Sequence, residues 1–236
     1  KIISPEEKRI IAYHEAGHAV VGYLLPNSDP VRKVTIIPRG MTGGSTLFLP
    51  EHDVSYISRS RMKDQIVMAL AGRAAEEIVF NEITTGASSD LEQVSKITRA
   101  MVTRFGMSEK LGPMMFGQKE EMIFLGREIS EQRDYSEAVA QEIDSEVRAI
   151  VTWAYDESRR LINENRDKLE TVAQRLLEIE TLDAEEFLAL MGEAKPTKAD
   201  EKPNSPPTNP RIKSGNSPAS DEGNDLKSLG TAPTPA

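Results

Sequence analysis

Apolar residues recur every three or four positions along most of residues 4–192, which is the spacing of one face of a helix. Between 133 and 163, for example, Val139, Ile143, Val147 and Ile150 lie on one side of a helix. Helices are expected over about residues 5–25, 55–80, 88–105, 133–163, 166–178 and 183–191. The pattern therefore predicts a mainly α fold.

Helix-capping residues support several of these starts. Ser4 is followed by Pro5 and, three residues after the cap, by Glu7, which together predict a capping box with proline at the first helical position. The same spacing of a cap and a glutamate marks three more starts: Ser89–Glu92, Asp134–Glu137 and Asp183–Glu186.

Two short segments have strand composition instead. Residues 31–37 are rich in β-branched residues and end at Pro38, and residues 45–49 end at Pro50. Gly43 and Gly44 precede the second strand and leave its backbone accessible, as in an edge strand that pairs with an extended peptide. An ordinary short hairpin explains the pattern equally well, so both interpretations stay open.

The composition changes at residue 193. Eight of the 14 prolines lie in residues 193–236, where apolar residues are few, so this part is predicted to be a disordered tail. Residues 1–192 form the expected folded domain. Residues 111–127 are rich in Met, Phe and Gly without helical periodicity, which fits a lid or, more simply, a packing loop.

Charge and composition exclude several function classes. The net charge of −9 gives no basic field for nucleic acid, and the absence of cysteine excludes disulfides and a cysteine-ligated zinc site. No apolar run reaches the roughly 18 residues of a membrane-spanning helix, so this chain is expected to be soluble.

One motif carries specific chemistry. His14-Glu15-Ala16-Gly17-His18 is an H-E-x-x-H sequence in the first expected helix, where residues four apart share a face. Both imidazoles can then bind one zinc ion, and Glu15 can take a proton from zinc-bound water and later protonate the leaving amine of a peptide. The flanking residues are almost all apolar, and burying this cluster without a partner costs several kcal/mol. The third histidine, His52, lies in a polar turn and is interpreted as a surface residue.

A catalytic zinc usually has three protein ligands, so a third is required. Without cysteine it should be a carboxylate, and pattern alone leaves several candidates, chiefly Glu76, Glu77, Asp90 and Glu92. Asp90 has the best case, because it lies in the first turn of an expected helix, where a short carboxylate is held rigidly. Glu76 is the rival if the site resembles thermolysin, with a glutamate on a later helix.

Four segments resemble the peptidase domain of FtsH-type proteases, which are membrane-anchored ATP-dependent zinc metalloproteases. They are AYHEAGHA at 12–19, AGRAAEEI at 71–78, TGASSD at 85–90 and MVTRFGMS at 101–108, followed by Leu111-Gly112-Pro113. The resemblance covers about residues 4–192. It implies that Asp90 is the third zinc ligand beside His14 and His18, and that Glu76 supports the site without binding the metal.

The resemblance also implies a helical fold with a small β element near the metal. It implies degradation of unfolded or damaged proteins by a homo- or hetero-hexamer, on the cytoplasmic, stromal or matrix face of a membrane. ATP and magnesium belong to an ATPase module, whose G-x-x-x-x-G-K-[ST] loop this sequence lacks, as it lacks the membrane anchor. The alternatives are a stand-alone metallopeptidase without an ATPase and an inactive zinc-binding scaffold subunit.

Overall fold

The computed structural model describes residues 3–38, 43–51, 53, 55–117 and 134–192. The predicted tail at 193–236, His52 and part of the loop predicted at 111–127 lie outside these residues. All statements below refer to the described part.

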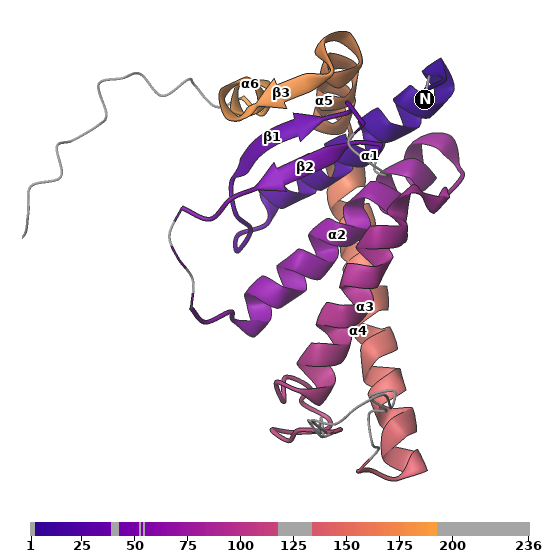
Figure 1. Ribbon diagram of the computed structural model, residues 1–236, viewed down its shortest axis with the longest axis vertical. Coiled ribbons are helices and arrows are strands. Elements are labelled where there is room, and N and C mark those ends of the chain that lie inside the picture. Colours follow the sequence, from indigo (N-terminus) through magenta and orange to yellow (C-terminus); the bar gives the residue numbers. More distant parts are fainter. Residues whose placement is uncertain (1–2, 39–42, 52, 54, 118–133, 193–236) are drawn as a thin grey trace, which may run out of the picture. The chain divides into compact units, whose positions relative to one another are not determined.

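The fold is mainly α, as predicted. Its helices are α1 (Pro5–Leu24), α2 (Arg59–Phe80), α3 (Ser88–Thr103), α4 (Glu137–Glu164), α5 (Arg166–Ile179) and α6 (Ala184–Leu190), and the 3₁₀ turn η1 (Thr85–Ala87) leads into α3. Helix α1 packs against α2 and α5, and α2 packs against α3 and α4 (Figure 1). Among the described residues, no helix combines the length and the apolar character needed to cross a bilayer.

A small sheet covers one side of α1 (Figure 1). It contains β1 (Val31–Thr35), β2 (Ser45–Phe48) and β3 (Thr181–Asp183) in the order β2-β1-β3, with both pairs antiparallel. Strand β3 was not predicted, because three residues are too few for a period-2 pattern. Its Leu182 pairs with Val34 of β1, and both side chains are fully buried.

The structure confirms some of the predicted helix caps and contradicts others. Ser4 caps α1 by accepting a hydrogen bond from the Glu7 N–H at 3.1 Å, and Asp183 forms the predicted capping box with Glu186. The prediction that Ser89 caps α3 is wrong, because η1 runs directly into this helix and its N-cap residue, Ala87, makes no side-chain bond.

Two helices begin later than predicted. Helix α2 begins at Arg59, with Ser58 as its cap, rather than at residue 55. Helix α4 begins at Glu137 rather than at residue 133, and its cap is Ser136 rather than the predicted Asp134. The Asp134 carboxylate instead accepts a hydrogen bond from the Gly117 N–H at 2.8 Å. Serine offers the same acceptor for a cap as aspartate, so sequence alone does not choose between neighbouring caps.

Candidate metal centre

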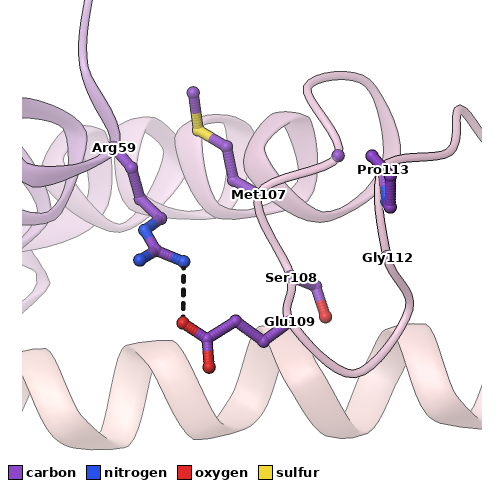
Figure 2. Close-up of a pocket in the computed structure, with 7 residues that line it drawn as sticks. Arg59, Met107, Ser108, Glu109, Gly112 and Pro113 are labelled. Carbon is purple, nitrogen blue, oxygen red and sulfur yellow. Dashed lines mark hydrogen bonds and ion pairs between the residues drawn. The ribbon is translucent and has the colours of Figure 1, made fainter.

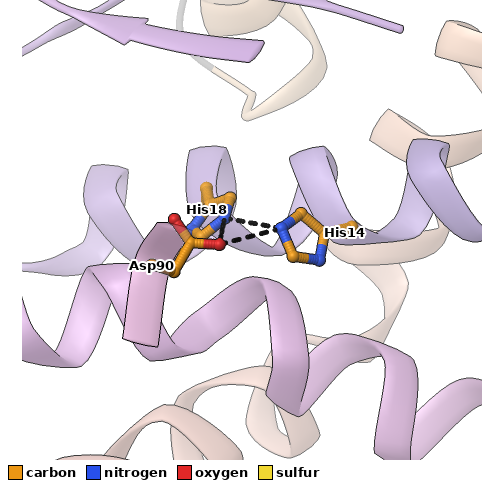
Figure 3. Close-up of side chains that lie close together, drawn as sticks. All are labelled: His14, His18 and Asp90. Carbon is orange, nitrogen blue, oxygen red and sulfur yellow. Dashed lines mark hydrogen bonds and ion pairs between the residues drawn. The ribbon is translucent and has the colours of Figure 1, made fainter. Parts of the chain in front are cut away.

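The two histidines of α1 and the aspartate of α3 form one cluster. One ligand atom from each of His14, His18 and Asp90 lies within 4.8 Å of the other two (Figure 3). His14 and His18 are buried, with exposed fractions of 9% and 8%, and the Asp90 side chain is 22% exposed. Residues 76 positions apart in the chain thus converge, because η1 turns the chain so that the first turn of α3 faces α1.

Hydrogen bonds on the far side of each ring fix the orientation of both imidazoles. His14 Nδ1 lies 2.6 Å from Glu76 Oε1, and His18 Nδ1 lies 2.8 Å from the backbone carbonyl oxygen of Met68. A carbonyl oxygen only accepts, so His18 Nδ1 carries the proton and donates it. This bond leaves Nε2 as the ring nitrogen that faces the cluster, and it is the nitrogen through which a neutral imidazole would bind a metal.

The Nε2 atoms of His14 and His18 are only 3.0 Å apart, and Asp90 Oδ2 lies 3.2 Å and 3.5 Å from them. Two nitrogen lone pairs and a carboxylate facing one another repel unless a cation or a proton lies between them. Burial lowers the pKa of His14, but the hydrogen bonds to Asp90 and Glu76 outweigh burial and raise its pKa from 6.5 to about 9. Burial raises the pKa of Asp90, but its contacts with both histidines outweigh this and bring it well below the usual range.

This donor set fits a zinc ion. Zinc binds neutral imidazole and carboxylate oxygen at about 2.0–2.2 Å and keeps a fourth position open in catalytic sites. The cluster offers two imidazole nitrogens and one carboxylate, and hydrogen-bonded partners hold the histidines in place from behind. A divalent cation at the centre of the cluster would offset the repulsion between these nitrogen and oxygen atoms.

Two glycines allow the close approach of α1 and α2 that the cluster needs. A Cβ at Gly72 would lie 2.5 Å from His14 Nε2 and 2.6 Å from His18 Nε2. A Cβ at Gly17 would lie 2.6 Å from the carbonyl oxygen of Ala71. Because contacts this short do not occur for real Cβ atoms, any side chain at these positions would displace the rings or separate the helices.

Glu15 is buried on the side of α1 that faces β2. Its carboxylate Oε2 accepts a hydrogen bond from Thr46 Oγ1 at 2.7 Å. The whole Glu15 residue is 6% exposed. The backbone of Gly44, just before β2, also lies close to this carboxylate, because a Cβ at this position would be 2.8 Å from Glu15 Oε1. The residue between the two candidate ligands is thus held by the small sheet.

The rival carboxylates make other contacts. Glu76 is 1% exposed and bridges His14 Nδ1 and the Thr84 N–H through its two oxygens. Glu77 accepts a hydrogen bond from the Tyr155 hydroxyl at 2.6 Å, and Glu92 pairs with Lys96 on the exposed face of α3. Of the four candidates, Asp90 is the one placed against both Nε2 atoms.

Four residues that shape this site were not singled out from the sequence: the carbonyl of Met68, Gly72, Thr46 and the N–H of Thr84. Three of them act through backbone atoms or the absence of a side chain, which leave no residue-type signal. Thr46 was included in the second predicted strand, but one threonine in a strand is ordinary.

A cavity of about 270 Å³ lies elsewhere, between the start of α2 and the turn that follows α3 (Figure 2). Arg59 and Glu109 form an ion pair of 3.1 Å across its rim, and Gly106, Met107, Ser108, Gly112 and Pro113 complete its lining. Arg59 is 13 residues before Gly72 in α2, about 20 Å along the helix axis. This cavity is therefore separate from the histidine cluster.

Comparison with known proteins identifies the family of this chain. The model of peptidase family M41 matches residues 1–190. An ATP-dependent zinc metalloprotease FtsH from Chloroflexus aggregans is 49% identical over 239 residues, covering 100% of this chain and 36% of the relative. FtsH 1 from Thermoanaerobacter sp. is 54% identical over 187 residues, covering 79% of this chain and 31% of the relative.

FtsH 3 from Symbiobacterium thermophilum is 50% identical over 215 residues, covering 91% of this chain and 34% of the relative. The chain thus spans about a third of the length of these relatives. With a family match over most of its length and identities near 50%, the chain belongs to peptidase family M41.

Proposed function

We propose that this chain is the zinc-dependent endopeptidase domain of an ATP-dependent protease. His14, His18 and Asp90 hold the zinc ion, and Glu15 is the general base and then the general acid. The observation that carries the proposal is the convergence of three ligand atoms within 4.8 Å. The orientation of both rings by Nδ1 partners adds to this support.

The chemistry divides between the metal and the chain. A zinc ion supplies a Lewis acid that lowers the pKa of water and polarises the carbonyl of the scissile peptide bond. Glu15 accepts the proton that water loses and returns it to the leaving amine, a transfer that contributes typically 10²–10⁴-fold to such a rate. His14 and His18 stay in place because Glu76 and the Met68 carbonyl hold their Nδ1 atoms.

Strand β2 is the proposed binding edge for the substrate backbone. In the described residues its ladder partner is β1 alone, so its second edge is open for pairing with an extended peptide. The same strand contacts Glu15 through Thr46, which brings this edge close to the general base.

The wider function rests on the relatives and on the resemblance of the sequence. The relatives are named ATP-dependent zinc metalloproteases, and this chain matches about a third of each. We propose that the parent protein adds an AAA ATPase module that uses ATP and magnesium, and a membrane anchor. The domain then works in a hexamer at the cytoplasmic, stromal or matrix face of a membrane and degrades unfolded or damaged proteins.

Hydrolysis of casein and of a short fluorogenic peptide by the purified full chain tests the peptidase assignment. We expect one zinc per chain, activity that chelation abolishes and zinc restores, and a Glu15→Gln variant that keeps zinc but loses at least roughly 100-fold in kcat. Loss of zinc in this variant would contradict the assigned roles. A zinc-loaded wild type that cleaves neither substrate would favour a non-catalytic scaffold.

A further inference from the structure

We propose that Thr46 is a positioning residue for Glu15, a role that rests on the proposed function of Glu15 as general base. The Thr46 hydroxyl lies 2.7 Å from Glu15 Oε2 and 3.2 Å from the backbone carbonyl oxygen of the same residue. A carboxylate accepts hydrogen bonds more strongly than a carbonyl, so the single hydroxyl proton goes to Oε2. The other oxygen, Oε1, stays outside this bond and is left to exchange a proton with water.

The sheet makes Thr46 a rigid anchor. Thr46 pairs with Val34 in the β1–β2 ladder, and Val34 is fully buried between the sheet and the helices. Threonine is β-branched, so its χ1 angle has few choices in a strand. A glutamate side chain has three rotatable bonds, and the fixed hydroxyl removes most of the freedom that Glu15 would otherwise have.

Gly44 restrains the same carboxylate from a second direction. A Cβ at this position would lie 2.8 Å from both Cγ and Oε1 of Glu15, and 2.8 Å from the carbonyl oxygen of Thr35. The Thr35 oxygen belongs to strand β1, which cannot move aside without breaking the ladder. Glycine is therefore required for the chain to pass this close to Oε1, while Thr46 binds Oε2.

The consequence is that strand β2 has two roles in one short segment. Its open edge is the proposed contact for the substrate backbone, and its inward-facing hydroxyl sets the position of the base. A distortion of β2 then changes the position of the peptide and of Glu15 together. Thr46 acts through Glu15 and is not itself assigned any contact with the reacting atoms.

Removal of the hydroxyl tests this role. In the zinc-loaded full chain, Thr46→Val keeps the shape of the side chain. We expect kcat on a fluorogenic peptide to fall at least about 10-fold, the low end of the value of one hydrogen bond to a charged group. KM should change less than about 2-fold and zinc should remain at one per chain, since Thr46 is not a ligand. Thr46→Ser restores the hydroxyl and should keep kcat within about 3-fold of wild type.

Several outcomes would overturn the proposal. They are a wild-type kcat in Thr46→Val, a Thr46→Ser variant as slow as Thr46→Val, or a loss confined to KM. If Thr46→Val does not fold, Thr46→Ala removes the same hydroxyl without adding a methyl group, and the same comparison with Thr46→Ser applies.

The double variant Glu15→Gln/Thr46→Val separates the positioning role of Thr46 from the assignment of Glu15 as the base. When Glu15→Gln has already removed the base, Thr46→Val should cause no further loss of kcat, and an additive loss would contradict a role through Glu15. If Glu15→Gln is itself fully active, the proposed function of Glu15 is wrong. If Glu15→Gln is inactive and Thr46→Val is normal, only the positioning role fails.

Discussion

Glu76 Oε1 lies 2.6 Å from His14 Nδ1, so a fully buried carboxylate binds the back of an imidazole whose front faces Asp90. The second oxygen of Glu76 accepts the Thr84 N–H at 2.9 Å, which ties the turn before α3 to the same carboxylate. Burial raises the pKa of Glu76, but the contact with His14 outweighs burial and the net pKa is lowered. Glu76 therefore supports the cluster as an anion from behind the histidine.

This arrangement predicts a ranking of two carboxylate variants. Glu76→Gln keeps a side-chain oxygen for His14 Nδ1 and should lower zinc affinity about 10-fold, near the small end for residues that orient a ligand. Asp90→Asn removes a ligand charge and should lower zinc affinity by more than about 100-fold. Competition with a fluorescent zinc chelator measures both constants at one pH.

Glu92→Gln is the matched control, since Glu92 lies in the same first turns of α3 and pairs with Lys96 on the surface. Its zinc affinity should equal that of wild type. A larger loss in Glu76→Gln than in Asp90→Asn would transfer the third ligand position to Glu76.

Gly72→Ala should damage the site without removing any ligand. The new Cβ would lie 2.5 Å from His14 Nε2 and 2.6 Å from His18 Nε2, so both rings must move. Alanine gains about 1 kcal/mol of helix propensity over glycine, but overpacking costs about 1–3 kcal/mol, so the metal-free chain should be slightly destabilised. The zinc affinity of Gly72→Ala should be well below that of wild type.

Gly17→Ala separates ring displacement from general overpacking at the α1–α2 crossing. Its Cβ would meet the backbone carbonyl oxygen of Ala71 at 2.6 Å rather than the histidine rings. Chemical unfolding and zinc titration of both variants provide the comparison. At equal loss of stability, Gly72→Ala should lose more zinc affinity, and equal losses of affinity would show that ring displacement is not the cause.

The sequence predicted the elements better than it predicted their contacts. The helical spacing located every described helix, with boundaries wrong by four residues at the start of both α2 and α4. His14 and His18 could be placed on one helical face because their spacing is local. The pairing of β1 with β3 joins residues about 150 positions apart, and no local pattern reports such a contact.

The third candidate ligand shows the same limit. From the pattern alone, Asp90 had the best case, but Glu76, Glu77 and Glu92 were not excluded. The resemblance to a known family then selected Asp90. The structure distinguishes them because α2 and α3 fix which carboxylate reaches both Nε2 atoms. Thr46 was hidden for a similar reason, since its contact with Glu15 depends on how the sheet sits against α1.

Tyr155 and Glu77 predict a pH dependence of stability at alkaline pH. Burial and the hydrogen bond to Glu77 raise the pKa of Tyr155 from 10.0 to about 12. The folded state therefore keeps the phenol proton that the unfolded state loses above pH 10, so this stabilisation is complete below that pH. It is lost as the pH rises towards 12.

Urea unfolding of wild type and Tyr155→Phe across this pH range measures the effect. Wild type should be the more stable protein below pH 10, and the difference between the two should shrink as the pH approaches 12. The comparison cancels the titration of other tyrosines and lysines. A difference that is constant across the range would mean that the Tyr155–Glu77 bond does not perturb the phenol.

The open edge of β2 predicts which peptide bonds of a substrate need their N–H groups. A peptide that extends a sheet uses the N–H of alternate residues for the ladder, while the intervening ones face away. N-methylation at one set of alternate positions should therefore raise KM about 5-fold per lost hydrogen bond, since each is worth about 1 kcal/mol. Methylation at the intervening positions should leave KM nearly unchanged. In both series kcat should change little, because the methyl groups lie away from the scissile bond. A KM that rises equally at every position would indicate a steric effect of the methyl groups and would remove β2 as the binding edge.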